Sequence, residues 1–212
     1  MSIQFEPTAV RGIVFDLYHT LVHITAKVDP YRRFLRALDF SHGQIERERR
    51  RLMTEPMGSK AAMSQLFAPD RAVPDYDLDH DLLVELNSTR LYADTRPTLA
   101  TLQERFPLFL LSNITTHYKA PFFRLGLEPS FRQVFFSCDL GHIKPEAELF
   151  AEVEKATGFG PQELLMVGDS PKSDFFGARD AGWQSLLLDR TGRWSHAPSI
   201  QSLSELPGLL RL

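Results

Sequence analysis

Four short apolar runs along the chain are each followed by side chains able to do chemistry: Asp16, Ser112 with Asn113, Lys144, and Asp169 with Asp174. Carboxylates that converge repel one another unless a proton or a cation lies between them. Mg²⁺ prefers such oxygens, usually together with water and a substrate phosphate. A carboxylate can also be a nucleophile in phosphoryl transfer, and a lysine ammonium can neutralise charge on phosphoryl oxygens. If these side chains meet, they suit a metal and phosphate site.

Each of these residues also has an ordinary structural explanation. Asp169 can cap the helix that Pro171 begins, Lys144 can be a solvated loop lysine, and Ser112 can be another cap. Asp16 is harder to explain in this way, because it ends an apolar strand with no helix to cap nearby. The coincidence of all of them at strand ends favours a shared site.

The apolar runs are predicted to be buried strands, at residues 11–16, 107–112, 133–138, 163–168 and 185–189. Helical patterns follow at residues 96–106, 115–125, 145–157 and 171–181. This alternation predicts an α/β fold, a Rossmann-like parallel sheet with helices on both faces. In such sheets ligands bind outside the carboxyl ends of the strands, where the candidate residues lie.

Residues 23–93 interrupt the alternation. They contain amphipathic helical stretches, such as YRRFLRALDF, and no convincing strand. The segment is too long for a βα connection. We therefore predict an inserted helical cap over the carboxyl edge of the sheet, with a catalytic core made of residues 1–22 and 94–212. Linkers near residues 21–25 and 92–96 would let the cap open and close.

Composition excludes several classes of function. A net charge of -3 over 212 residues offers no field that would attract nucleic acid or anionic lipid. No apolar run approaches the roughly 20 residues that a membrane span needs. The N-terminal residues lack the order of a signal peptide, and the single Cys138 allows no internal disulfide. We expect a cytoplasmic protein with no nucleic-acid or membrane partner and a buried Cys138; the oligomeric state stays open.

In order and spacing, these residues resemble the haloacid dehalogenase-like hydrolase superfamily. The first motif of that family, D-x-D-x-T after an apolar strand, is matched by FDLYHTL, and the second by FLLSN. The third matches GHIKPEAELF, and the fourth, the longest and most specific, matches VGDSPKSDFFGARDAG. The resemblance covers residues 11–189, and the insertion after the first motif looks like the helical cap of one subclass.

The resemblance implies a role for each matching residue. Asp16 would be the nucleophile that forms an aspartyl-phosphate. Mg²⁺ would be held by Asp16, Asp169 and the backbone carbonyl of Tyr18. The other expected catalytic residues hold or stabilise the transferring group: Thr20, Ser112, Lys144 and Asp174. The expected substrate contacts are Tyr18, His19 and Asn113, and the substrate would be a small phosphorylated molecule.

Tyr18 departs from the family's phosphatases, in which an aspartate at this position protonates the leaving alcohol. Tyrosine, with an unperturbed pKa of about 10, is a poor replacement. The family's hydrolytic haloacid dehalogenases carry D-x-Y-G-T and need neither an acid nor a metal, so they resemble this chain at Tyr18, although they have glycine at the position of His19. They typically have small polar residues in place of Gly168 and Asp169. Without a metal, Asp169 would repel a haloacid carboxylate.

Three hypotheses follow. The fourth motif is the longer match and supplies a metal ligand, so it favours a Mg²⁺-dependent phosphatase. The alternatives are a hydrolytic 2-haloacid dehalogenase, or a weakly active or inactive binder of a phosphate ligand that has lost its acid. In the first case His19, a cap residue or water could replace the missing acid. Candidates for contacting an anionic substrate are Arg32, Arg33 and Arg36, on the first predicted cap helix.

Overall fold

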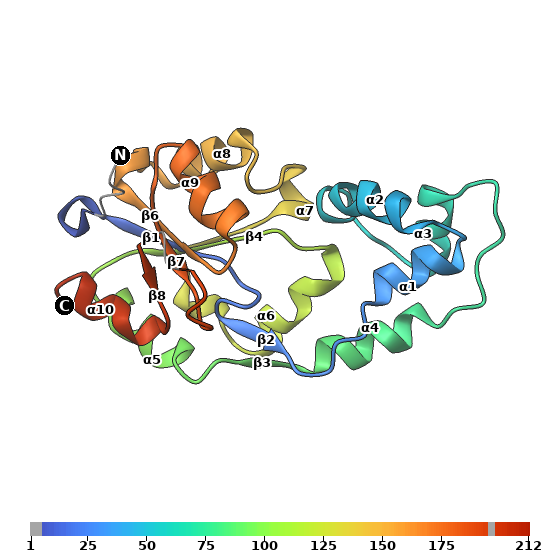
Figure 1. The fold of residues 1–212 in the computed structure, drawn as a ribbon, viewed down its shortest axis with the longest axis horizontal. Coiled ribbons are helices and arrows are strands. Elements are labelled where there is room, and N and C mark those ends of the chain that lie inside the picture. The colour runs from blue at the N-terminus through green and yellow to red at the C-terminus, as the bar shows by residue number, and fades with distance from the viewer. Residues whose placement is uncertain (1–5, 195–197) are drawn as a thin grey trace.

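The computed structural model describes residues 6–194 and 198–212. Its main sheet is parallel, with strand order β5-β4-β1-β6-β7-β8 (Figure 1). The strands are β1 Gly12–Phe15, β4 Leu108–Ser112, β5 Gln133–Phe136, β6 Leu164–Gly168, β7 Gln184–Leu188 and β8 Ser199–Ile200. All five predicted runs form strands, and the Rossmann-like parallel sheet is confirmed. Because β1 lies between β4 and β6, Asp16 leaves the sheet near its centre.

Helices cover both faces of the sheet, as predicted (Figure 1): α5 Thr95–Gln103, α6 Ala120–Arg124 and α10 Leu206–Leu209 on one face, α8 Ala147–Thr157 and α9 Gly177–Asp180 on the other. The side chains of β1 alternate between two apolar clusters, one on each face of the sheet. Ile13 and Phe15 pack on the first face and Val14 on the second, and all three are fully buried. Each such side chain contributes about 1.5–3 kcal/mol to stability.

Four further helices form a separate group at one end of the molecule (Figure 1): α1 Pro30–Ala37, α2 His42–Thr54, α3 Lys60–Phe67 and α4 Leu78–Asn87. We call residues 30–87 the helical insert. It has its own apolar cluster, which includes Phe34 of α1, Leu52 of α2 and Leu82 of α4. The Ser41 side chain forms a capping box with Gln44, which starts α2.

The expectation of no strand in residues 23–93 was wrong. β2 Val22–Ile24 pairs antiparallel with β3 Thr89–Leu91, where the chain enters and leaves the helical insert. Three-residue strands are too short to show a two-residue alternation, so the pattern missed them. β8 was also missed, because it has only two residues.

Three predicted boundaries need correction. The strand predicted at residues 133–138 ends at Phe136, and a short helix, α7 Ser137–Leu140, contains the buried Cys138. The helix predicted at 171–181 is a π-helix, Pro171–Phe176, followed by α9. The helix predicted at 115–125 begins as a 3₁₀ turn, Thr116–Lys119. Each helix in the described part of the chain is too short or too polar to cross a bilayer.

Gly168 ends β6 directly against the Asp174 side chain. A Cβ atom at position 168 would lie 2.2 Å from Asp174 Oδ2. Gly168→Ala should therefore lower the free energy of unfolding by about 1–3 kcal/mol, as overpacked core sites do. The matched control is Gly43→Ala in α2, where a Cβ would meet nothing within 4 Å. Urea denaturation of both variants checks this, and equal stabilities would contradict it.

Candidate active site

The loop after β1 is a tight turn that carries the first motif. The His19 amide donates to the Val22 carbonyl (2.7 Å), and the Val22 amide donates to the Leu17 carbonyl (3.0 Å). His19 has φ = 64°, in the left-handed region where glycine costs least. Glycine, which the dehalogenase form of the first motif carries at this position, adopts this conformation most readily. None of these bonds uses the Tyr18 carbonyl, which leaves that oxygen available to a ligand.

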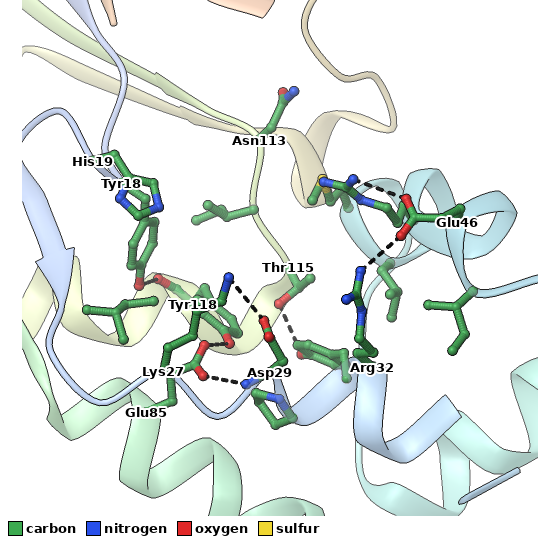
Figure 2. Close-up of a pocket in the computed structure, with 18 residues that line it drawn as sticks. Tyr18, His19, Lys27, Asp29, Arg32, Glu46, Glu85, Asn113, Thr115 and Tyr118 are labelled. Carbon is green, nitrogen blue, oxygen red and sulfur yellow. Dashed lines mark hydrogen bonds and ion pairs between the residues drawn. The ribbon is translucent and has the colours of Figure 1, made fainter. Parts of the chain in front are cut away.

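The Tyr18 side chain belongs to the junction between sheet and helical insert. Its hydroxyl donates to the Tyr118 carbonyl at 3.0 Å, and the two rings meet edge to face (Figure 2). Burial raises the pKa of the Tyr18 hydroxyl above its usual value. A phenol that already donates to a carbonyl and holds its proton more tightly than usual is a poor general acid. Thr20 is fully buried, and its Oγ1 has no hydrogen-bond partner among the described residues.

A cavity of about 440 Å³ lies between this edge of the sheet and the helical insert (Figure 2). All three predicted substrate contacts line it: Tyr18, His19 and Asn113. Of the three arginines singled out on the first cap helix, Arg32 lines the cavity. Arg33 instead pairs with Asp81 at 3.0 Å, and Arg36 is not part of the cavity wall.

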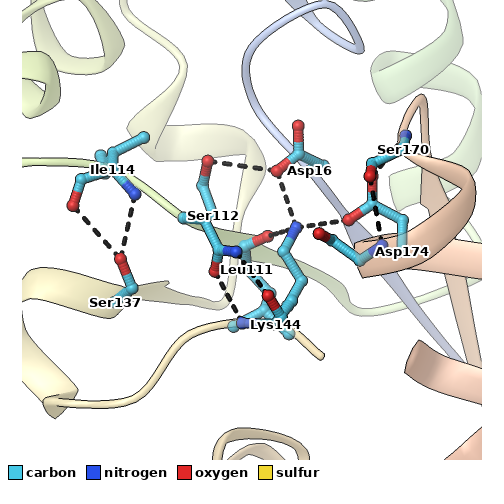
Figure 3. Close-up of polar contacts among 10 residues, drawn as sticks. Asp16, Leu111, Ser112, Ile114, Ser137, Lys144, Ser170 and Asp174 are labelled. Atoms are coloured by element: carbon cyan, nitrogen blue, oxygen red, sulfur yellow. Dashed lines mark hydrogen bonds and ion pairs between the residues drawn. The ribbon is translucent and has the colours of Figure 1, made fainter. Parts of the chain in front are cut away.

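Lys144 is the centre of the polar site (Figure 3). Its Nζ donates to Asp16 Oδ1 at 2.7 Å and to the Leu111 carbonyl at 2.7 Å, and it forms an ion pair with Asp174 Oδ1 at 2.6 Å. The side chain is 1 % exposed. Burial opposes its charge, but the carboxylates of Asp16 and Asp174 outweigh that cost and raise the pKa of Lys144. The ammonium group thus has two hydrogen-bond acceptors, Asp16 Oδ1 and the Leu111 carbonyl, and a third, ionic partner in Asp174.

The Lys144 backbone is held by Asn113. The Asn113 side chain accepts from the Lys144 amide and donates to the Lys144 carbonyl, both at 2.8 Å. Its predicted role as a substrate contact is thus combined with a structural one. Ser137 was not among the predicted site residues; its hydroxyl accepts from the Ile114 amide at 3.0 Å and donates to the Ile114 carbonyl at 3.2 Å (Figure 3). The only signal for it was a serine inside the apolar run VFFSC.

Asp16 presents one occupied and one open oxygen. Its Oδ1 accepts from Ser112 Oγ at 3.2 Å and from Lys144 Nζ, while its Oδ2 accepts no hydrogen bond from the described residues (Figure 3). Its amide donates to the Val167 carbonyl at 3.0 Å, which continues the pairing of β1 with β6. A carboxylate held through one oxygen leaves the other oriented for attack or for binding a cation.

Three carboxylates converge beside this ammonium. Ligand oxygens of Asp16, Asp169 and Asp174 all lie within 4.8 Å of one another. Burial, and then the charges of Asp16 and Asp174, raise the pKa of Asp169 to about 7, although Lys144 opposes the shift. Burial also raises the pKa of Asp174, whose Oδ2 accepts from the Ser170 amide at 2.9 Å. Three carboxylates and one ammonium leave excess negative charge, and hard oxygen donors of this kind fit a divalent cation such as Mg²⁺.

A family model of haloacid dehalogenase-like hydrolases matches residues 10–182, and the chain belongs to this family of hydrolases. It is similar to a glyceraldehyde 3-phosphate phosphatase from Methanopyrus kandleri, with 27% identity over 85% of this chain and 84% of that protein. It is also similar to a phosphoserine phosphatase from Thermus thermophilus, with 34% identity over 58% of this chain and 49% of that protein. These relatives support a phosphatase-type hydrolase.

Solved structures show the same fold. The HAD-hydrolase YfnB from Bacillus subtilis, which was solved bound to magnesium, has a TM-score of 0.69 at 21% identity and covers 96% of this chain and 99% of its own. A 2-haloacid dehalogenase from Pseudomonas syringae has a TM-score of 0.64 at 24% identity and covers 95% and 98%. Because both metal-bound and dehalogenase relatives share the fold, the fold does not choose between the two chemistries.

The raised pKa of Asp169 makes stability depend on pH. The folded, metal-free protein keeps a proton on Asp169 up to about pH 7, whereas the unfolded chain loses it near the usual pKa of 3.8. The resulting stabilisation is present below pH 4 and is lost as the pH rises through 7. Asp169→Asn should remove that part of the decline, so its free energy of unfolding in EDTA should fall less than that of the wild type between pH 4 and 8.

Urea denaturation across this pH range measures the difference. The control is Asp180→Asn, an exposed aspartate of α9, which should follow the wild type. Mg²⁺ added at pH 7.5 should raise the melting temperature of the wild type more than that of Asp169→Asn. The ion would neutralise the ionised Asp169 carboxylate, which the variant lacks. Parallel pH curves for Asp169→Asn and the wild type would contradict the assignment.

Proposed function

We propose that this protein is a Mg²⁺-dependent phosphatase that acts on a small phosphorylated metabolite through an aspartyl-phosphate on Asp16. The observation that carries the proposal is the group of three converging carboxylates beside a single buried ammonium. The phosphatase relatives, glyceraldehyde 3-phosphate phosphatase and phosphoserine phosphatase, support the same substrate class. The cavity beside the site has room for the organic part of such a metabolite.

The proposed metal ligands are Asp16, Asp169 and the carbonyl of Tyr18, with Asp174 completing the shell or orienting Lys144. A bound Mg²⁺ ion would neutralise the carboxylates and attract the substrate phosphate. Asp174 is already paired with Lys144 and with the Ser170 amide. This pairing favours its role as the group that orients Lys144.

In the proposed reaction, Asp16 Oδ2 attacks phosphorus, and the bond from phosphorus to the leaving oxygen breaks. Water then attacks the phosphorus of the acyl phosphate, which releases inorganic phosphate and regenerates the Asp16 carboxylate. Lys144 and Ser112 hold Asp16 Oδ1 throughout, and the Lys144 ammonium balances negative charge that grows on the transferring group. Thr20, with its unpaired hydroxyl, would donate to Asp16 or to the phosphoryl group.

The missing acid limits the range of good substrates. The Tyr18 hydroxyl is bonded to Tyr118, so the leaving oxygen must depart without a proton or take one from His19 or from water. His19 lines the cavity at the carboxyl edge of the sheet, where the proposed substrate would bind. We therefore propose that esters with good leaving groups react faster than alkyl phosphates. We propose further that the helical insert, within residues 23–93, acts as a cap that closes over the substrate.

The dehalogenase alternative fits this site less well. It is favoured by Tyr18, which matches the dehalogenase form of the first motif. A 2-haloacid carries its own carboxylate, and next to Asp16 it would meet the charges of Asp169 and Asp174 with only Lys144 to balance them. Repulsion of this kind is strong in a partly buried site. Halide release from 2-haloacids in EDTA would support the alternative.

Asp16→Asn should reduce phosphate release from p-nitrophenyl phosphate to background, because the amide is not a nucleophile of this kind. Wild-type release should require Mg²⁺ and stop in EDTA. The assay is inorganic phosphate release, and Asp180→Asn is the matched control. Turnover that survives in Asp16→Asn would sink the nucleophile assignment. Phosphate binding without turnover in the wild type would point to the inactive binder.

The cost of the missing acid can be measured with a series of phosphate esters. Acid catalysis typically contributes 10²–10⁴-fold, so kcat/KM should fall by about that factor from p-nitrophenyl phosphate to alkyl phosphates. Tyr18→Phe should leave this dependence on the leaving group unchanged, since the hydroxyl it removes donates to Tyr118. A steeper dependence in Tyr18→Phe would show instead that the Tyr18 hydroxyl is the acid.

A further inference from the structure

Arg190, from a distant part of the chain, contacts residues 16–21, which we call the nucleophile loop, and residues 92–94, where the chain returns from the helical insert. Arg190 lies two residues beyond β7, at the carboxyl edge of the sheet. One of its terminal nitrogens donates to the Thr20 carbonyl at 2.9 Å. The guanidinium also binds both oxygens of Asp94, at 2.9 and 3.0 Å. We propose that Arg190 is a positioning residue, which holds the nucleophile loop and the linker near residues 92–96 in one fixed arrangement.

The nucleophile loop and the linker near residues 92–96 meet at this guanidinium. Thr20 belongs to the outgoing chain just before β2, and Tyr92 and Asp94 belong to the returning chain just after β3. The guanidinium lies over the Tyr92 ring, 3.7 Å from its centroid, so that one face of the cation is covered. Tyr92 in turn stacks on His23 of β2 at 4.7 Å. A single side chain thus contacts the nucleophile loop and the returning linker at once.

Asp94 anchors this arrangement to the C-terminal part of the chain. Besides Arg190, it accepts from Ser202 Oγ at 2.8 Å and from the Leu203 amide at 2.9 Å. Burial opposes its charge, but Arg190, Ser202 and the Leu203 amide together hold the pKa of Asp94 below its usual range. The side chains of Arg190 and Asp94 are only 20 % and 14 % exposed. A planar guanidinium can serve two carboxylate oxygens and a carbonyl together, which the point charge of a lysine cannot do.

The Thr20 carbonyl transmits this anchoring toward the reacting groups. Thr20 follows Asp16 by four residues, within the turn that also carries Tyr18 and His19. The next carbonyl, of Leu21, accepts from the Tyr92 amide at 3.1 Å and from Thr95 Oγ1 at 2.7 Å. Two consecutive carbonyls of the loop are therefore bonded to the returning linker or to Arg190. Loss of the Arg190 contact with the Thr20 carbonyl therefore removes one of the bonds that fix the end of the turn, which places Tyr18 and His19 at the edge of the cavity.

Arg190 bonds the Thr20 carbonyl and contacts none of the side chains to which we assign chemistry, so its effect should appear as local mobility and as a change in kcat. In Arg190→Gln, amide hydrogen exchange should become at least tenfold faster at residues 17–22 and 92–95, while the amides of β4 and β6 keep their protection. With p-nitrophenyl phosphate and Mg²⁺, kcat should fall about tenfold, with KM changed less than twofold. Arg190→Lys should lie between the wild type and Arg190→Gln in both measurements.

The control is Arg11→Gln, which removes an exposed arginine–glutamate pair before β1, at the other end of the strand. It should change neither measurement. Hydrogen exchange needs no turnover, so the proposal can stand even if the protein is not a phosphatase. Unchanged exchange at residues 17–22 in Arg190→Gln would overturn it, as would an equal loss of protection throughout the sheet, which indicates a global structural role. If Arg190→Gln does not fold, the same two readouts on Arg190→Lys decide between these outcomes.

Discussion

The buried ammonium of Lys144 is the constraint on which the rest of the site depends. A charge that is 1 % exposed is tolerated only where acceptors surround it, and removing one partner of such a pair costs about 3–5 kcal/mol. Its partners come from different elements: Asp16 after β1, the Leu111 carbonyl in β4 and Asp174 in the π-helix. The parallel sheet has to bring these elements to one edge. The same contact that neutralises the lysine therefore aligns the candidate nucleophile.

Three carboxyl groups lie beside one ammonium, and the excess negative charge favours the binding of a cation. Burial, and then the negative charges of Asp16 and Asp174, raise the pKa of Asp169 to about 7. Gly168 permits this crowding, since any larger residue would collide with Asp174. Stability is given up locally to hold like charges together, as is common where pKa values are tuned for chemistry. A divalent cation would relieve the same repulsion.

The junction with the helical insert shows how Tyr18 can stand where the family's phosphatases have an aspartate. Tyr18 bonds to the Tyr118 carbonyl, and the Tyr118 hydroxyl donates to Glu85 of α4. The buried Glu85 carboxylate also accepts from the Asp29 amide at 2.7 Å, just before α1. The tyrosine is thus part of a polar chain that links the nucleophile loop to the helical insert. At this position the Tyr18 hydroxyl makes a structural contact and is not free to act as a proton donor to substrate.

The sequence by itself determined the parallel sheet, the helices on its two faces and the edge at which Asp16, Lys144 and Asp169 meet. Apolar strands that alternate with helices form a parallel sheet, and polar residues that follow such strands lie at its carboxyl edge. Only the tertiary structure decided which atoms are hydrogen-bonded to one another. It placed the Tyr18 hydroxyl on Tyr118, and it brought Arg190 to Thr20 across 170 residues of sequence. Local patterns cannot contain such contacts, since the packing of distant elements sets the distance and direction of each hydrogen bond.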